Sequence, residues 1–310
     1  MSDKNIPAFI DCYGDLSDLF TKEMKDFIPD LKIYSGITKN ECDTIRRIGT
    51  HQNIMVYMAY LSAKVLHSCP NLKSISYLST GTSTHGDLLT ASKLGIRFEG
   101  VKSYGNRAVA EHAITLALAS LKRLTEMDRA VRGEKWGLMR TEEISGKTFG
   151  IVGLGGIGQE TAKIAKALGA RTIAWNRSPK GKFQDVEIVP LEIVLAESDI
   201  ISFHLALNEE TKDFLNSSNL AKTKPGVILI NTSRAKVLKE SALLEGLKSG
   251  HIGHCAMDVF HQEPLPKHHP FKSMDSVTLT PHSAWVTSQA IDRLIWAGLK
   301  QLKKHVSETN

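Results

Sequence analysis

Length, composition and charge exclude several classes of protein at the outset. The chain has 310 residues, 42% of them apolar and 23% charged, which is ordinary for a globular protein of two domains or of one large α/β unit with an insertion. Its longest apolar stretches, near residues 113–121 and 149–157, are much shorter than the roughly 20 residues of a transmembrane helix. We therefore expect no membrane span and no membrane partner.

The net charge and the cysteines bear on the partners, the metal sites and the compartment of the protein. The formal charge of +6 is modest, and the densest basic run, at residues 300–305, ends a predicted helix, where cations are favoured. No nucleic-acid partner is expected. The four cysteines lie far apart without a C-x-x-C pair, and the sequence opens on polar residues rather than an apolar signal segment. A cytoplasmic protein with no disulfide framework and no metal site is the expectation.

Apolar, β-branched segments alternate with longer helical patterns along the chain, which is typical of parallel βαβ construction. A helix is predicted at 16–27 and another at 108–124. The strands predicted in the first hundred residues are Ala8–Cys12, 53–57, 72–79 and 96–99.

From residue 148 onward the alternation becomes more regular. Helices are predicted at 157–168 and 239–249, and a last helix at 287–304. Six strands linked by crossovers are the number found in a complete dinucleotide-binding sheet. The six predicted strands are Thr148–Val152, Arg171–Trp175, 200–204, Val227–Asn231, 254–258 and 276–280.

A glycine-rich segment follows the first of these strands and opens the next helix. It contains G-x-G-x-x-G at Gly153, Gly155 and Gly158, with Gly156 and Ile157 inside the pattern. Alone the pattern is weak, but between a strand and an amphipathic helix it predicts a dinucleotide site. Gly153 suits the tight turn, Gly155 the approach of a pyrophosphate, and Gly158 the close packing of helix on sheet. The alternative is a glycine-rich turn that binds nothing.

The end of the second strand indicates which dinucleotide would bind. NAD-specific sites usually carry Asp or Glu there to hold the ribose 2′-hydroxyl, whereas this chain has Asn176, Arg177 and Ser178. A guanidinium and a hydroxyl suit a 2′-phosphate, which a carboxylate would repel. Lys180 and Lys182 add positive charge nearby. We predict NADP as the preferred cofactor; if Arg177 is only a surface residue, the site accepts NAD as well.

Three further segments resemble the D-isomer-specific 2-hydroxyacid dehydrogenase family, and in particular its glyoxylate and hydroxypyruvate reductases. They are INTSRA at 230–235, DVFHQEPL at 258–265 and LTPHSAW at 279–285. With residues 109–112 and 224–226, the order and spacing of these segments extend the resemblance over most of the chain.

The resemblance implies an α/β fold with two domains. A Rossmann dinucleotide-binding domain would span 105–283, and a discontinuous, flavodoxin-like substrate domain would comprise 1–104 and 284–310, with the active site in the cleft between them. The helix that carries residues 109–112 would contribute to the interface of a homodimer.

The resemblance also implies a catalytic Arg, Glu and His, which map onto Arg234, Glu263 and His282. A guanidinium can hold the carboxylate of a 2-oxo acid and polarise its ketone. A histidine can donate the proton as hydride arrives from the nicotinamide, and a paired carboxylate would orient it and favour its protonated form. Taken singly, each of the three could be structural. Each follows a predicted strand, however, at the edge where open α/β sheets bind ligands.

Less specific positions complete the predicted cofactor site. His204, Thr232 and Asp258 would border the cofactor, with Asp258 near the nicotinamide carboxamide. Each has an ordinary structural interpretation too; Asp258 at a strand end could simply cap the next turn.

The departures from the family pattern concern the substrate. Where many relatives have G-x-G-x-D, residues 79–87 read STGTSTHGD, and Ala235 replaces the common Gly after the catalytic Arg. We expect Thr80, Gly81 and Thr82 still to contact the substrate, with altered preference. Trp285 is similar to the aromatic residue that follows the catalytic His in members that reduce hydroxypyruvate and glyoxylate.

The predicted function is the NADP-preferring reduction of a small 2-oxo acid, of the glyoxylate or hydroxypyruvate type, to the 2-hydroxy acid, with the proton from His282. One alternative is a nucleotide-sensing interaction protein with little turnover, built on a dehydrogenase scaffold. Another is a dehydrogenase of the same family that acts on formate or phosphite. The intact Arg234, Glu263 and His282 favour an enzyme.

Overall fold

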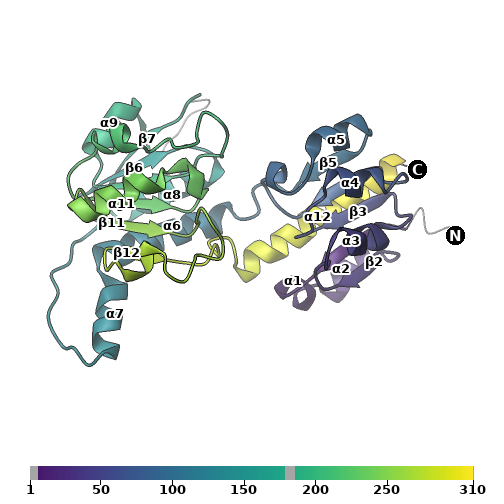
Figure 1. Cartoon of the computed structure of the whole chain (residues 1–310), viewed down its shortest axis with the longest axis horizontal. Coiled ribbons are helices and arrows are strands. Elements are labelled where there is room, and N and C mark those ends of the chain that lie inside the picture. Colours follow the sequence, from purple (N-terminus) through teal and green to yellow (C-terminus); the bar gives the residue numbers. More distant parts are fainter. Residues whose placement is uncertain (1–5, 179–185, 310) are drawn as a thin grey trace. The chain divides into compact units, whose positions relative to one another are not determined.

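The computed structural model describes residues 6–178 and 186–309. The chain divides into two compact units, Met1–Gly105 with Val286–Asn310, and Asn106–Trp285, which are described separately. Both are parallel sheets with helices between successive strands (Figure 1).

The discontinuous unit is built on a five-stranded parallel sheet in the order β2-β1-β3-β4-β5. This order is the flavodoxin-like one. The central strands β1, β3 and β4 are buried along their whole length, as strands covered by helices on both faces must be. The strands are β1 (Ala8–Cys12), β2 (Lys32–Ser35), β3 (Asn53–Val56), β4 (Ser74–Tyr77) and β5 (Arg97–Gly100).

Short helices connect these strands, and one long helix returns from the far end of the chain. The single helix predicted at 16–27 is wrong: there are two helices, and Thr21 caps the second by accepting from the Met24 amide at 3.3 Å. The helices are α1 (Asp15–Asp18), α2 (Lys22–Phe27), α3 (Glu41–Ile48), α4 (Ala63–His67), α5 (Leu88–Lys93) and α12 (Ser288–Thr309).

Helix α12 packs closely against β3 and β4 at Gly298. A Cβ at this glycine would lie 2.3 Å from Leu78 Cδ2 and 3.0 Å from Met55 Sδ. The carbonyl of Gly298 also accepts from Ser76 Oγ at 3.1 Å. The absence of a side chain at this position therefore lets helix and sheet approach.

The second unit contains a seven-stranded parallel sheet in the order β12-β11-β10-β9-β6-β7-β8. Counted within the unit, the first six strands have the Rossmann order 3-2-1-4-5-6. The six predicted strands are present, but the predicted count of six is wrong because the two-residue β8 adds a seventh. The strands are β6 (Thr148–Val152), β7 (Arg171–Trp175), β8 (Glu187–Ile188), β9 (Ile200–Phe203), β10 (Val227–Asn231), β11 (Ile252–Met257) and β12 (Val277–Leu279).

The helices of this unit cover the sheet, with one exception. Helix α7 projects from the body of the unit (Figure 1) and has no buried residue. It continues into residues 133–147, which contain neither helix nor strand. The helices are α6 (Asn106–Leu121), α7 (Leu124–Arg132), α8 (Gly156–Ala167), α9 (Leu191–Glu197), α10 (Ser217–Leu220) and α11 (Glu240–Ser249).

The strand order also positions the site. The chain passes from β6 to β7 on one side and reaches β9 on the other, so that β6 and β9 are neighbours. The crevice at the carboxyl ends of such a pair is where open α/β sheets bind dinucleotides.

Candidate functional site

The glycine-rich loop after β6 has a geometry that only glycine satisfies at two positions. Gly153 has φ +98°, and a Cβ there would lie 2.8 Å from the carbonyl oxygen of His204. A Cβ at Gly158 would lie 2.2 Å from the Gly153 carbonyl oxygen. The tight turn and the close packing of α8 on the sheet both depend on these glycines.

The N-terminus of α8 is open to a ligand. Gly155 is the N-cap residue and supplies no side-chain hydrogen bond to the first-turn amides, which include those of Gly156 and Ile157. A Cβ at Gly155 would meet nothing within 4 Å. At Gly156, by contrast, a Cβ would lie 2.2 Å from Asn106 Nδ2. Uncapped amides at a helix N-terminus favour an anion.

At the end of β7, the side chain of Asn176 forms hydrogen bonds to the glycine loop and to the segment that follows β7. Its Oδ1 accepts from the Leu154 amide at 3.2 Å, and its Nδ2 donates to the Ser178 carbonyl at 3.1 Å. Arg177 is exposed and forms an ion pair with Glu210, from the segment after β9. Ser178 is exposed as well, whereas Lys180 and Lys182 lie outside the described residues.

Two buried polar atoms lie on the segments that follow β9 and β10. Within the described part of the chain, His204 Nδ1 and Thr232 Oγ1 have no hydrogen-bond partner. The other ring nitrogen of His204 is 3.0 Å from Ser202 Oγ, and burial lowers the pKa of His204 to about 4, so that the ring is neutral at pH 7.

Buried polar groups without partners are costly in a folded protein. Two of them after neighbouring strands at the carboxyl edge of a Rossmann sheet are compatible with a polar ligand bound there.

His282 and Glu263, which the sequence predicts as catalytic partners, are in direct contact. His282 Nδ1 donates to Glu263 Oε2 at 2.8 Å, and Glu263 Oε1 accepts from the Phe260 amide at 2.9 Å. Both side chains are partly exposed, 41% and 38% respectively. A carboxylate on Nδ1 leaves Nε2 as the ring atom that can exchange a proton with a substrate.

Arg234 follows β10, whereas Glu263 follows the neighbouring strand β11 and His282 follows β12. Its guanidinium donates to the Ser233 carbonyl at 2.7 Å, so that among the described contacts it does not bond to Glu263 or His282. Asn231, at the end of β10, organises this turn: its Nδ2 donates to the Arg234 carbonyl at 3.1 Å, and its Oδ1 accepts from the Ser233 amide at 3.0 Å.

Asp258 is fully buried at the end of β11. Its Oδ1 accepts from Thr280 Oγ1 at 2.6 Å and from the Ser283 amide at 3.0 Å, and its Oδ2 accepts from the Ala284 amide at 3.0 Å. Both oxygens thus bond to the segment that contains His282. Sequence reasoning missed this arrangement, and a direct contact of Asp258 with the cofactor stays a prediction.

The predicted substrate loop belongs to the discontinuous unit, where it follows β4. Thr80 Oγ1 donates to the Val101 carbonyl at 3.2 Å, Gly81 N donates to Ser79 Oγ at 3.4 Å, and Thr82 begins a short 3₁₀ turn. Ser79 Oγ also lies 3.1 Å from His85 Nε2. Trp285, the last residue of the Rossmann unit, is half-buried.

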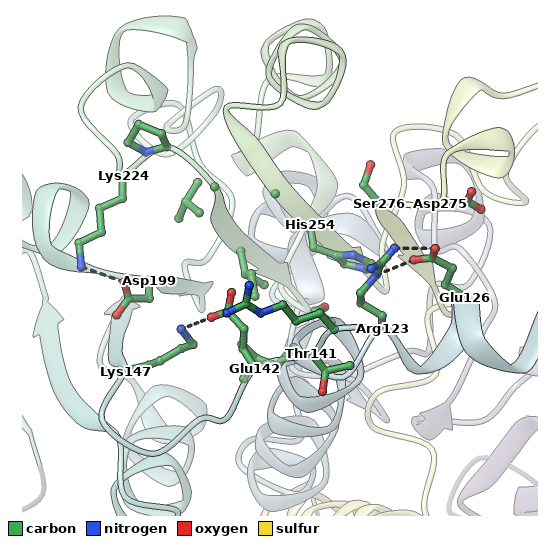
Figure 2. Close-up of a pocket in the computed structure, with 18 of the residues that line it drawn as sticks. Arg123, Glu126, Thr141, Glu142, Lys147, Asp199, Lys224, His254, Asp275 and Ser276 are labelled. Carbon is green, nitrogen blue, oxygen red and sulfur yellow. Dashed lines mark hydrogen bonds and ion pairs between the residues drawn. The ribbon is translucent and has the colours of Figure 1, made fainter. Parts of the chain in front are cut away.

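A separate cavity of about 770 Å³ opens at the opposite edge of the Rossmann sheet, where β6, β9, β10 and β12 begin. Three of the four Lys and Arg side chains that line it form ion pairs: Lys224 with Asp199, Arg123 with Glu126, and Lys147 with Glu142 (Figure 2). Four carboxylates also line the cavity. Because the charges neutralise one another, and because ligands of such sheets bind at the carboxyl edge, this cavity is not the candidate active site.

Two further features concern ligands and membranes. In residues 6–178 and 186–309, no three His, Cys, Asp or Glu side chains gather as the ligands of a metal ion would. In the same residues, no helix has both the length and the apolar character needed to cross a membrane.

A Rossmann sheet with a glycine-rich loop at its switch point defines a class of protein, the dinucleotide-binding proteins. Comparison with known proteins identifies the family. The model of the D-isomer specific 2-hydroxyacid dehydrogenase NAD binding domain matches residues 114–284. The chain belongs to this family, and its cofactor is NAD or NADP.

Individual relatives agree with this identification. A glyoxylate reductase of Thermofilum pendens is 37% identical over 244 residues, which cover 76% of this chain and 72% of the relative. A hydroxypyruvate reductase of Blautia hydrogenotrophica is 30% identical over 272 residues, 84% of each chain. An acyclic imino acid reductase, solved in complex with NADPH and D-Arg, is similar over 97% of both chains with a TM-score of 0.87 and 25% identity.

Proposed function

We propose that this enzyme reduces a small 2-oxo acid of the glyoxylate or hydroxypyruvate type, with NADPH preferred over NADH. The observation that carries the proposal is the 2.8 Å contact between His282 and Glu263, at the carboxyl edge of a sheet built to bind a dinucleotide. Arg234 follows the neighbouring strand at the same edge.

Each side chain has a role that suits its chemistry. Arg234 holds the substrate carboxylate and polarises the ketone, because a guanidinium stays charged and donates in a fixed plane. His282 gives the proton on Nε2 to the developing alkoxide, while Glu263 fixes the orientation of the ring through Nδ1. When bound, the nicotinamide supplies the hydride.

The NADP preference is supported by the end of β7. Residues 176–178 include neither Asp nor Glu, and Arg177 and Ser178 are exposed there. The related acyclic imino acid reductase was solved with NADPH.

The substrate class is supported by the relatives and by one residue of this chain. Two of the relatives are named for glyoxylate and hydroxypyruvate, and Trp285 follows the catalytic segment. We propose that Thr80, Gly81 and Thr82 also contact the substrate.

We further propose a cytoplasmic homodimer. The four cysteines are free, three of them buried, which suits a reducing compartment. Helix α7 and the segment after it expose Leu124, Val131, Trp136 and Leu138, at 56%, 55%, 88% and 104%. Large exposed apolar side chains favour an interface, and a second copy of the chain would cover them.

The test is oxidation of NADPH and NADH by the purified protein against glyoxylate, hydroxypyruvate, pyruvate and bulkier 2-oxo acids. His282→Ala should reduce kcat by about 10²- to 10⁴-fold, the contribution of a general acid, without loss of NADPH binding measured by fluorescence. His268→Ala, an exposed histidine of the same unit, is the matched control and should behave as wild type.

Two outcomes would contradict the proposal. Unchanged turnover of His282→Ala would remove this residue from the chemistry. NADPH binding without turnover of any acid would favour the nucleotide-sensing protein.

A further inference from the structure

The segment that contains His282 has an unusual backbone conformation. His282 has φ +53°, in the left-handed region that residues other than glycine rarely adopt. The neighbouring amides of Ser283 and Ala284 both donate to Asp258, each at 3.0 Å. Because these two bonds lie immediately after His282, the position of Asp258 determines how the imidazole is presented to Glu263.

Asp258 accepts a third bond, from Thr280 Oγ1 at 2.6 Å, and Thr280 is in turn 3.0 Å from His112 Nε2. An ionised carboxylate only accepts hydrogen bonds, and a hydroxyl has a single proton to donate. The Thr280 proton therefore goes to Asp258, and His112 must be the donor to Thr280. His112 Nε2 also lies 3.7 Å from Asp258 Oδ1.

We propose that His112, Thr280 and Asp258 form a positioning relay that holds His282 in its left-handed conformation and thereby aligns its ring with Glu263. The relay starts on α6, passes through the residue after β12, and ends at the carboxyl end of β11. These residues act through the backbone of 283–284 and not on the substrate. The inference deepens the proposed function and rests on the role of His282 in it.

The relay predicts a specific pattern of defects. Thr280→Val keeps the shape of the side chain but removes the donor to Asp258 and the acceptor for His112. Asp258 then loses one of its three bonds, and His282 can relax out of alignment. A misplacement of about 1 Å can cost about 100-fold in rate, so we expect kcat to fall by about 10- to 100-fold while KM for the 2-oxo acid stays unchanged.

The conservative variant and a double variant separate positioning from a general structural defect. Thr280→Ser restores the hydroxyl and should restore kcat. His112→Leu should lower kcat less than Thr280→Val, and the double variant should be no worse than Thr280→Val alone, because both changes break the same chain of bonds. Rates are expressed per NADPH-binding site titrated, so that an unfolded fraction does not count.

Any of three results would overturn the relay. They are a wild-type kcat in Thr280→Val, a kcat in Thr280→Ser as low as in Thr280→Val, and additive losses of kcat in the double variant. His282→Ala measured in parallel distinguishes this failure from that of the proposed function. If His282→Ala is inactive while Thr280→Val is normal, only the relay is wrong. If His282→Ala is active, the proposed function itself fails.

Discussion

The proposed preference for NADPH over NADH depends on one charged residue, Arg177. It is exposed and already paired with Glu210, so a 2′-phosphate that binds Arg177 must compete with this carboxylate. Two substitutions at this pair have opposite expected effects on NADPH.

Arg177→Ala should weaken NADPH binding by about 10- to 100-fold, the range for losing a charge-assisted hydrogen bond, and leave NADH almost unchanged. Equal losses for both cofactors would show that Arg177 does not read the phosphate. Fluorescence titration of each cofactor measures both values.

Glu210→Gln should strengthen NADPH binding by about twofold to fivefold, because exposed ion pairs contribute little and the substitution also removes a negative charge. Glu209→Gln, an exposed neighbour with the same charge change, is the control. Weaker NADPH binding in Glu210→Gln would mean that the carboxylate orients Arg177 instead of competing for it.

At the same scale, the sequence predicts the glycine loop and the catalytic candidates but not the hydrogen bonds that hold the segment around His282. Glu263 and His282 were paired through the family resemblance, and their contact is present in the structure. The contact from His112 to Thr280 joins residues 168 positions apart. No local pattern predicts it, because it depends on where α6 packs relative to the end of β12.

Among the elements, the buried strands were predicted at or near their observed bounds, as was the four-residue, partly exposed β5, whereas β2 and β8 were missed. Strands β6, β7 and β10 have their predicted bounds, since a run of buried apolar residues is a strong signal. The missed strands β2 and β8 are partly or fully exposed and only four and two residues long. The predicted helix at 16–27 is divided because Thr21 caps the N-terminus of α2 and so begins a separate helix.

Packing of α12 can be tested at Gly298. Alanine normally stabilises a helix relative to glycine by about 0.5–1 kcal/mol, but a Cβ here would lie 2.3 Å from Leu78 Cδ2. Overpacking of a buried contact costs about 1–3 kcal/mol, so Gly298→Ala should lower the Tm. Lys300→Ala, exposed on the same helix, should change stability by less than about 0.5 kcal/mol. A Tm at or above wild type in Gly298→Ala would mean that Leu78 moves aside without cost.

At the scale of the whole molecule, the exposed apolar side chains of α7 bear on assembly. Sedimentation of the wild-type protein should give twice the mass of one chain. Val131→Glu places a charge among the exposed side chains and should produce monomers, because an unpaired charge is costly to bury. Lys222→Glu, at an exposed position of the same unit, should remain dimeric. A wild-type monomer, or a Val131→Glu dimer, would exclude α7 from a homodimer interface.

The order of the chain through the two units has a consequence for synthesis on the ribosome. The five strands of the flavodoxin-like sheet precede residue 106, whereas α12, which packs on β3 and β4, follows residue 285. All seven strands of the Rossmann sheet are therefore translated before the first sheet receives its covering helix. Since domains generally fold as units during synthesis, the unit that is translated first must be the last to be completed, and a growing chain exposes the α12 face of β3 and β4 until then.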